Sequence, residues 1–541
     1  MDIFGTLDWL MVGLYFAIIL GIAWWVIRQK QESSTDYFLA GRHVGWFIIG
    51  ASIFASNIGS EHIVGLAGTA AKTGVTMGIY ELHSWIILLL GWVFVPFYMR
   101  SMVFTMPEFL ERRYSPTARW FLSLVSLISY VLTKVAVNVY AGAVVFQVLM
   151  GIDFWTGALI VVILTGIYTI LGGLRAVVYT ESLQAIILIL GSVIVTIVGL
   201  FKIGGWDQLI AVVGSQHFNL FLPADHPEFP WPGMVFAPPI VGLWYWCTDQ
   251  YIVQRTLAAR NEQQARRGAI FAAFLKLLPF FIFVIPGVIA FALAKTGKLD
   301  LTSADQAFPA MVKTLLPTGI RGLIVGGLLA ALMSSLASVF NSCSTLFTMD
   351  IYKKLRPQAS EKTLVRVGRI ATAVVVLFGL LWIPLMKNIS GELYHYLQSV
   401  QSYIAPPIAA VFFLGVFWSR INARGAVTTL FAGFILGMLR LILELSKSHL
   451  SGVLFAFANV NFLYFAIFLF VFCIFVLIVV SLLSPKPASE QIAGLTYATT
   501  MKEDKLKSRA SWNSLDLILS GIIVLAIVAI LIYFSPLGIS Q

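Results

Sequence analysis

Long apolar segments with few charges recur along the whole of this 541-residue chain. An α-helix needs roughly 20 such residues to cross a bilayer. The segments are continuous rather than alternating, which excludes a transmembrane β-barrel. We therefore predict an all-α polytopic membrane protein with fourteen transmembrane helices. The expected spans are 6–27, 45–71, 76–99, 120–150, 154–172, 178–201, 235–253, 268–294, 322–350, 368–386, 394–418, 425–446, 455–483 and 514–535.

The composition and the placement of charge agree with this class. The chain is 59% hydrophobic and 11% charged, whereas soluble domains are about a quarter charged. Its net charge of +11 could indicate nucleic-acid binding. With the N-terminus outside, however, most Lys and Arg residues fall in cytoplasmic loops, among them Arg255 and Arg260. We therefore expect both termini outside, membrane lipids as neighbours and no nucleic-acid partner.

A polar run, ASNIGSEH at residues 55–62, interrupts the second expected span. Amide, hydroxyl, carboxylate and imidazole groups are costly in hydrocarbon, so they should face a cavity, a partner or a ligand. A similar run, WYWCTDQ at 244–250, begins five spans later. Because five is odd, the two interrupted helices run antiparallel. This pattern favours a five-plus-five inverted repeat whose broken helices hold a substrate and an ion.

Several polar or aromatic side chains are candidates for the ligand site, and each has a plainer alternative. Glu81 is an interfacial carboxylate or an acceptor for substrate hydroxyls. Lys276 extends towards the cytoplasm or donates into a central cavity. Gln398 joins helices to one another or contacts the ligand. Tyr245 and Trp246 belong to an interfacial belt or stack against a sugar ring beside the second break.

Hydroxyl groups cluster in SSLAS, residues 334–338. Small hydroxylated residues let membrane helices approach closely, which explains part of the cluster. The alternative is a cation site in which the hydroxyls of Ser334 and Ser335 join carbonyls released near Ala55 and Ile58. Oxygen ligands of this kind suit a hard monovalent cation.

Seven segments together form a recognisable pattern. They are GASIFASNIGSEHIVGLAGTAA (50–71), GWVFVPFY (91–98), FTMPEFLERRY (104–114), LWYWCTDQYIVQR (243–255), FLKLLPFF (274–281), SSLASVFNSCSTLFTMDIY (334–352) and YLQSVQSYIAPPIAAVFF (396–413). In this order they strongly resemble the sodium/solute symporter family, specifically its sodium–glucose cotransporter branch. The resemblance implies a LeuT-type inverted repeat. We expect a first peripheral helix and cytoplasmic loop (1–44), a ten-helix transport core (45–418) and three peripheral helices (419–541) with a cytoplasmic linker at 485–513.

The resemblance also implies site residues. The family's sugar contacts carry over onto Asn57, His62, Glu81, Tyr245, Trp246, Lys276 and Gln398. Its main sodium site carries over onto the carbonyls of Ala55, Ile58 and Ala331 and the hydroxyls of Ser334 and Ser335. Members that bind two sodium ions resemble this chain at a further site, where Glu181 replaces the usual aspartate and Ala337 a threonine. We therefore expect one sodium ion per sugar.

Two departures from the family pattern leave the sugar open. Gly242 stands where some sugar transporters have a hydroxyl, and Leu82-His83 replaces the usual Trp-Asn pair. Glu61 has no assigned role. The expected function is sodium-coupled symport of a neutral hexose such as glucose or galactose across the plasma membrane. The alternatives are a polyol such as myo-inositol, an amino acid or a sialic acid as the solute, or a sugar sensor that does not transport.

Other function classes lack support in the sequence. It contains no phosphate-binding GxxxxGK[ST] motif and no cysteine–histidine cluster. Transport driven directly by ATP and a transition-metal site are therefore not expected. We see no pairing of a nucleophile with a base, so we predict neither an enzyme nor an organic cofactor. Co-transported sodium is the one inorganic ligand expected.

Overall fold

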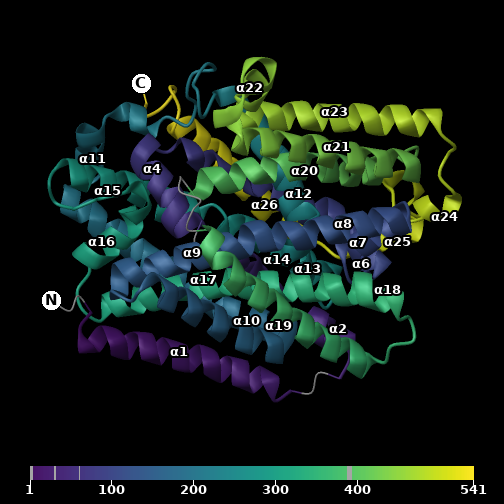
Figure 1. The fold of residues 1–541 in the computed structure, drawn as a ribbon, viewed down its shortest axis with the longest axis horizontal. Helices are drawn as coiled ribbons and strands as arrows, with labels where there is room; N and C mark the ends of the chain where they lie inside the picture. The colour runs from purple at the N-terminus through teal and green to yellow at the C-terminus, as the bar shows by residue number, and fades with distance from the viewer. Residues whose placement is uncertain (1–3, 30–31, 60, 387–392, 541) are drawn as a thin grey trace.

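The structure is a computed structural model that describes residues 4–29, 32–59, 61–386 and 393–540. These residues are predominantly helical, and the β-type pairing among them is one isolated parallel bridge between Val44 and Ala259. Most long helices lie close to a common axis, which is horizontal in Figure 1. The all-α class predicted from the sequence is confirmed.

The helices fall into three consecutive groups along the chain. The first is α1 (Thr6–Ile27), α2 (Ser34–Leu39), α3 (Trp46–Asn57), α4 (Ala67–Thr73), α5 (Trp85–Leu89), α6 (Val95–Ser101), α7 (Met106–Arg113), α8 (Pro116–Ser129), α9 (Ala136–Val145) and α10 (Phe154–Ile203). The second is α11 (Trp206–Val213), α12 (Trp231–Cys247), α13 (Gln250–Leu257), α14 (Glu262–Leu275), α15 (Ile285–Lys295), α16 (Ala307–Leu315), α17 (Ile320–Thr345) and α18 (Lys353–Leu355). The third is α19 (Glu361–Met386), α20 (Leu393–Phe417), α21 (Ala423–Leu445), α22 (Gly452–Ala458), α23 (Phe462–Leu483), α24 (Ser489–Ile492), α25 (Lys502–Ala510) and α26 (Ser514–Tyr533).

Fewer helices than fourteen meet a simple test for membrane spans. Among the described residues, eleven helices are long and apolar enough to cross a membrane, and one bent pair of helices brings the number to twelve. Two expected spans, 154–172 and 178–201, lie within the single helix α10. The expected span at 235–253 is divided between α12, which has 17 residues, and the shorter α13. The count of fourteen remains a prediction.

Helix α10 turns sharply inside its length. Its 50 residues would extend about 75 Å if straight, far beyond the roughly 30 Å of a hydrocarbon core. Gly173 has φ 55° and ψ −158°, which is outside the helical region. A Cβ atom there would lie 2.5 Å from the carbonyl oxygen of Tyr37, so glycine is needed for conformation and for space. The turn falls between the two expected spans.

Both interruptions predicted from polar runs are breaks in helices. Helix α3 ends at Asn57, Ile58 is extended (φ −81°, ψ 98°), and the chain resumes as a π-helical segment, Glu61–Leu66, that leads into α4. The two arms of this pair are bent by 58°. Helix α12 ends at Cys247, and the carboxylate of Asp249 caps the start of α13. Helix ends leave backbone groups without intrahelical partners, so each break offers polar backbone to a site.

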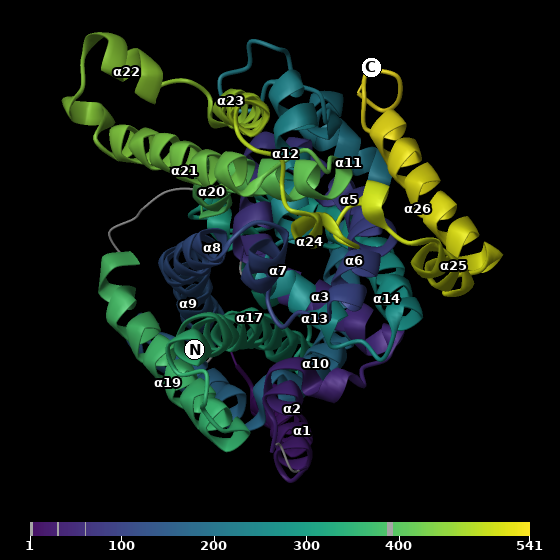
Figure 2. The same ribbon diagram turned by 90° about the vertical axis from the view of Figure 1, so that its right-hand side faces the viewer.

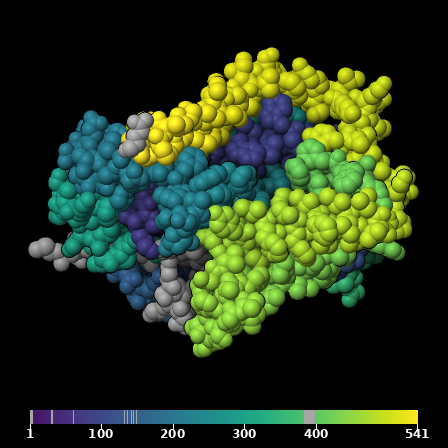
Figure 3. Space-filling model, turned by 90° about the horizontal axis from the view of Figure 1, so that it is seen from above, coloured from purple at the N-terminus to yellow at the C-terminus, as the bar shows by residue number. Residues whose placement is uncertain are grey.

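The centre of the bundle is formed by α17 and the broken helix α3. Helix α17 packs extensively against α10, and α3 against α14. In the candidate span that contains α17, 94% of the residues in the most apolar window are buried, against 22% in α26. Figure 3 shows the C-terminal helix, in yellow, lying along the outside of the molecule. The inner helices are therefore the ones that can enclose a polar site.

The two ends of the bundle differ in what they carry. The N and C marks lie at one end, together with α11 and α16. Helices α2, α18, α24 and α25 lie at the other end, which faces the viewer in Figure 2. At this second end, Thr105 and Ser115 accept hydrogen bonds from the backbone of Glu108 and Ala118 and so start α7 and α8.

Candidate functional site

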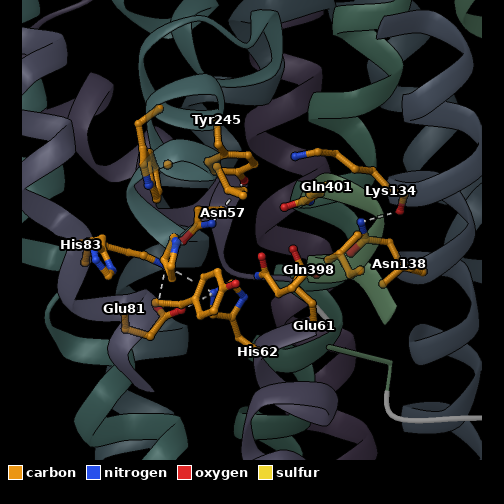
Figure 4. Close-up of a pocket in the computed structure, with 18 residues that line it drawn as sticks. Asn57, Glu61, His62, Glu81, His83, Lys134, Asn138, Tyr245, Gln398 and Gln401 are labelled. Atoms are coloured by element: carbon orange, nitrogen blue, oxygen red, sulfur yellow. Dashed lines mark hydrogen bonds and ion pairs between the residues drawn. The ribbon is translucent and has the colours of Figure 1, made fainter. Parts of the chain in front are cut away.

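A polar cavity lies between the two broken helices, α3 with its continuation and α12 with α13. Its lining residues come from the first break, the segment 76–84, the region 134–138, α12, α14 and α20; they are Asn57, Glu61, His62, Tyr80, Glu81, His83, Lys134, Val137, Asn138, Pro238, Val241, Gly242, Tyr245, Trp246, Lys276, Leu397, Gln398 and Gln401. All seven predicted sugar contacts are among them. Figure 4 shows their arrangement.

Lys276 is the centre of a buried polar cluster on one side of the cavity. Its Nζ atom lies 2.5 Å from Glu81 Oε2 and donates a 2.7 Å hydrogen bond to Asn57 Oδ1. His62 Nε2 lies 3.4 Å from both Lys276 Nζ and Glu81 Oε1. The charge of Lys276 is thus neutralised by the carboxylate of Glu81 inside the bundle, and its side chain does not extend to the cytoplasm. The structure brings together four residues that are far apart in the sequence.

This cluster presents both donors and acceptors to the cavity. A buried ion pair compensates two charges that would each be costly alone, and removal of one partner leaves the other uncompensated. Ammonium and carboxylate groups also form strong hydrogen bonds with neutral hydroxyls. A polyhydroxylated ligand can donate to Glu81 and accept from Lys276 without bringing a net charge into the bundle.

An aromatic wall stands beside the cluster. The Asn57 amide donates a 3.2 Å hydrogen bond to the hydroxyl of Tyr245. The rings of Tyr245 and Trp246 lie 4.9 Å apart in a T-shaped arrangement, and Lys276 Nζ lies 5.4 Å from the Trp246 ring centroid. Gln398 projects from α20, and its Oε1 atom has no hydrogen-bond partner among the described residues. The cavity thus combines aromatic faces with polar groups.

The predicted sodium ligands lie where the first break meets α17. Ser335 donates a 3.0 Å hydrogen bond to the carbonyl of Ser56, next to Ala55. The buried hydroxyl of Ser334 has no partner within the described part of the chain. Ala331 lies one turn earlier on α17, and Ile58 forms the break itself. An unpaired buried hydroxyl on a helix that contacts the break is the kind of group that an oxygen-ligated cation could satisfy.

Comparison with known proteins decides the family. A family model described as the sodium:solute symporter family matches residues 37–437. The chain belongs to this family. The symporter is 38% identical to sheep sodium/glucose cotransporter 1, over 92% of this chain and 82% of the relative. It is also 38% identical to human sodium/myo-inositol cotransporter 2, over 90% of this chain and 78% of that relative.

A solved structure shares the symporter's fold. It is a Na⁺-coupled sialic acid symporter in a substrate-bound outward-open state, with a TM-score of 0.77 and 23% sequence identity. The match covers 89% of this chain and 98% of that one. The likeness establishes the fold, and the solute has to be argued from this symporter's own cavity.

Glu181 is held in a buried ion-pair network against α3 and α17. Its Oε1 atom lies 3.0 Å from Arg255 Nη2. Its carboxylate also accepts hydrogen bonds from the hydroxyls of Ser52, Ser56 and Ser338. Both charged side chains are fully buried. The expectation that Arg255 lies in a cytoplasmic loop is wrong, because α13 continues through it and turns its guanidinium inwards.

Residues not assigned from the sequence complete the cavity. Glu61, Asn138 and Gln401 line it, and Lys134 Nζ lies 4.1 Å from the ring centroid of Tyr245. For two of these four residues, the local sequence gave an indication of a role in the site. Glu61 is in the first polar run, and a lysine within a span is costly unless it faces a polar site. Asn138 and Gln401 carry no comparable local signal.

The two departures from the family pattern both lie at the cavity. Gly242 lines it, and a Cβ atom at this position would lie 2.6 Å from Ile86 Cδ1. His83 also lines it and makes a 2.7 Å hydrogen bond to the carbonyl of Ile79. Leu82, in contrast, is buried in the apolar core. Positions 242 and 83 can therefore influence which solute fits.

Proposed function

We propose that this symporter couples the entry of sodium to the uptake of a neutral hexose or cyclic polyol by alternating access. The observation that carries the proposal is the cluster of Lys276, Glu81 and Asn57 in a cavity beside the break in α3. The names of the sodium/glucose and sodium/myo-inositol relatives support this choice of solute. The seven residues predicted as sugar contacts are the proposed solute site.

The charges at the cavity favour a neutral solute. Lys276 is neutralised by Glu81, and no arginine is among the described residues that line the cavity. A carboxylate ligand would therefore lack the bidentate guanidinium partner that commonly binds such groups. This argues against a sialic acid, in spite of the fold shared with a sialic acid symporter.

Coupling follows from the position of the two proposed sites on one break. Sodium would be held by the carbonyls of Ala55, Ile58 and Ala331 and the hydroxyls of Ser334 and Ser335. The solute would contact Asn57 between two of these carbonyls. An ion that orders this segment lowers the cost of binding the solute, and the solute then favours closure and inward release.

The proposed topology is a LeuT-type five-plus-five inverted repeat with fourteen spans. The break after α3, the turn at Gly173 and the passage of α12 into α13 support this count. Residues 45–418 would form the transport core. The basic residues near α2, α18 and α25 favour a cytoplasmic location for that end. On this proposal both termini lie outside the plasma membrane.

Uptake by reconstituted vesicles tests this function. Labelled glucose, galactose, mannose and myo-inositol should enter only when sodium is the external cation, and potassium should not replace it. Lithium in place of sodium tests how closely the proposed oxygen ligands match sodium in size. Sodium-independent entry, or uptake of amino acids but of no ring polyol, would contradict the proposal. Binding without uptake would instead support a sensor.

The stoichiometry should be one sodium ion per solute. Glu181 is already engaged by Arg255 and three serine hydroxyls, and Ala337 offers no hydroxyl for a second ion. The ratio of charge movement to solute flux in the same vesicles should therefore be close to one. A ratio close to two would show that a second site operates.

A further inference from the structure

One carboxylate beside the first break has no cationic partner. Three ion pairs balance the other charged side chains around the cavity and the two breaks: Lys276–Glu81 at 2.5 Å, Arg255–Glu181 at 3.0 Å and Lys134–Asp249 at 3.9 Å. Glu61 forms no ion pair with another described residue, and its buried Oε2 atom has no hydrogen-bond partner among them. A buried carboxylate without a counter-charge is costly. This part of the bundle therefore carries one negative charge that its own cations leave unbalanced.

Two further oxygens face the place where this carboxylate lies. A Cβ atom at Gly59 would lie 2.7 Å from Asn138 Oδ1 and from Ser335 Oγ, and it would also contact Glu61 Oε2. Glu61 begins the π-helical segment after the break, Asn138 belongs to α9, and Ser335 belongs to α17. Segments that are distant in the chain thus direct three oxygens at one point, which the missing side chain of Gly59 leaves open.

All three oxygens act as acceptors at this point. The Asn138 amide nitrogen donates a 2.8 Å hydrogen bond to the carbonyl of Lys134, marked by a dashed line in Figure 4, which leaves the amide oxygen for this space. The Ser335 hydroxyl donates its hydrogen to the carbonyl of Ser56, and a carboxylate has no donor. A water molecule can donate to two of these oxygens but does not neutralise Glu61. A cation satisfies all three and also supplies the missing charge.

We propose that Glu61, Asn138 and Ser335 form a second position for the transported sodium ion, beside the sodium ligands proposed above. The inference rests on the proposed function and deepens it, because it assigns the residue that balances the charge of the ion. One carboxylate and two neutral oxygens suit a monovalent cation, whereas Ca²⁺ takes 6–8 oxygen ligands. Ser335 belongs to both positions, so two ions there would lie close together and repel each other. One ion therefore uses the positions in turn, and the stoichiometry stays at one.

Sodium binding in the absence of solute gives the first test. The unfolding temperature of the purified symporter should rise with sodium chloride, while potassium chloride keeps the ionic strength constant. In Glu61→Gln, which keeps the shape of the side chain, the sodium concentration for half-maximal stabilisation should rise roughly 10- to 100-fold. In Asn138→Leu it should rise about 2- to 10-fold, because a neutral ligand is lost. The exposed substitution Glu503→Gln on α25 is the control and should leave it unchanged.

Gly59→Ala separates a local site from a long-range effect of charge. The added methyl group would occupy the point that the three oxygens face, while the carboxylate of Glu61 remains in place. The sodium requirement for stabilisation should therefore rise about tenfold or more. Gly13→Ala on α1 is the matched control, because a Cβ atom there meets nothing within 4 Å. If Glu61→Gln raises the sodium requirement and Gly59→Ala does not, Glu61 acts only at a distance and the proposed position is wrong.

Uptake by reconstituted vesicles distinguishes failure of this inference from failure of the proposed function. In Glu61→Gln, the sodium concentration for half-maximal uptake should rise by the same factor as that for stabilisation. Sodium-driven uptake with an unchanged sodium requirement in Glu61→Gln and Asn138→Leu would overturn this inference alone. Wild-type uptake that is independent of sodium would refute the proposed function. A wild-type ratio of charge to solute close to two, lowered to one by Glu61→Gln, would show two ions bound at once and overturn their use in turn.

Discussion

Replacing Lys276 with methionine should lower sodium-driven solute uptake at least 10- to 100-fold. The substitution removes the donor that lies 2.5 Å from Glu81 and 2.7 Å from Asn57. Hydrogen bonds to charged groups contribute about 1.5–3 kcal/mol, which corresponds to this factor. The carboxylate of Glu81 is also left uncompensated in the bundle, at a cost of about 3–5 kcal/mol. Glu81→Gln should also reduce uptake, because it leaves the ammonium group of Lys276 without its carboxylate partner.

The double variant Glu81→Gln with Lys276→Met separates a role in binding from a role in stability. It contains no unpaired buried charge, so the yield of folded protein in detergent should recover towards wild type. Uptake should stay low, because both ligand groups are gone. Recovery of uptake together with yield would mean that the pair only stabilises the fold. The exposed Glu503→Gln again serves as control for expression and insertion.

Substituting alanine for Ser335 should raise the sodium concentration needed for half-maximal uptake roughly tenfold or more. The change removes one of the five oxygens proposed to hold the ion, and each contact with a charged group contributes on the order of 1.5–3 kcal/mol. Ser334→Ala should act in the same direction. Sodium binding and solute binding are thermodynamically coupled in this proposal. Once sodium saturates its site, the apparent affinity for the solute should therefore return close to the wild-type value.

Ser344→Ala is a matched control on the same helix. Ser344 is buried and donates a 2.6 Å hydrogen bond to the carbonyl of Gly368, away from the proposed ion site. Its loss should leave the sodium dependence of uptake unchanged. If Ser344→Ala and Ser335→Ala shift that dependence equally, the effect belongs to the packing of α17. An unchanged sodium requirement in Ser335→Ala would remove Ser335 from the ion site.

The membrane class and the two breaks could be predicted because their causes are local. Exposed backbone and charges are excluded from hydrocarbon wherever they occur, so apolar length alone indicates a span. The polar runs at 55–62 and 244–250 indicated the breaks for the same reason. The division into fourteen spans was harder, because α10 continues as one helix through two expected spans and turns only at Gly173.

The partners of buried charges could not be predicted in this way. Arg255 was placed in a loop from its position near a span end, whereas the structure pairs it with Glu181, 74 positions away. Glu61 carried no assigned role until the cavity showed which of its neighbours were already paired. Such pairings depend on how distant helices pack, about which the local sequence says nothing.

Taken by itself, the amino-acid sequence determined the all-helical class and both helix breaks. Through family resemblance it also predicted seven solute contacts, which line one cavity in the structure. Only the tertiary structure decided that Lys276 neutralises Glu81 and that Glu61 and Gln398 keep unpaired acceptors. The free energy of transferring a segment into the bilayer is a sum over its residues, so it can be estimated from the sequence alone. Hydrogen bonds and ion pairs require two groups to meet at about 3 Å, and that meeting is settled by the packing of α3, α14 and α20.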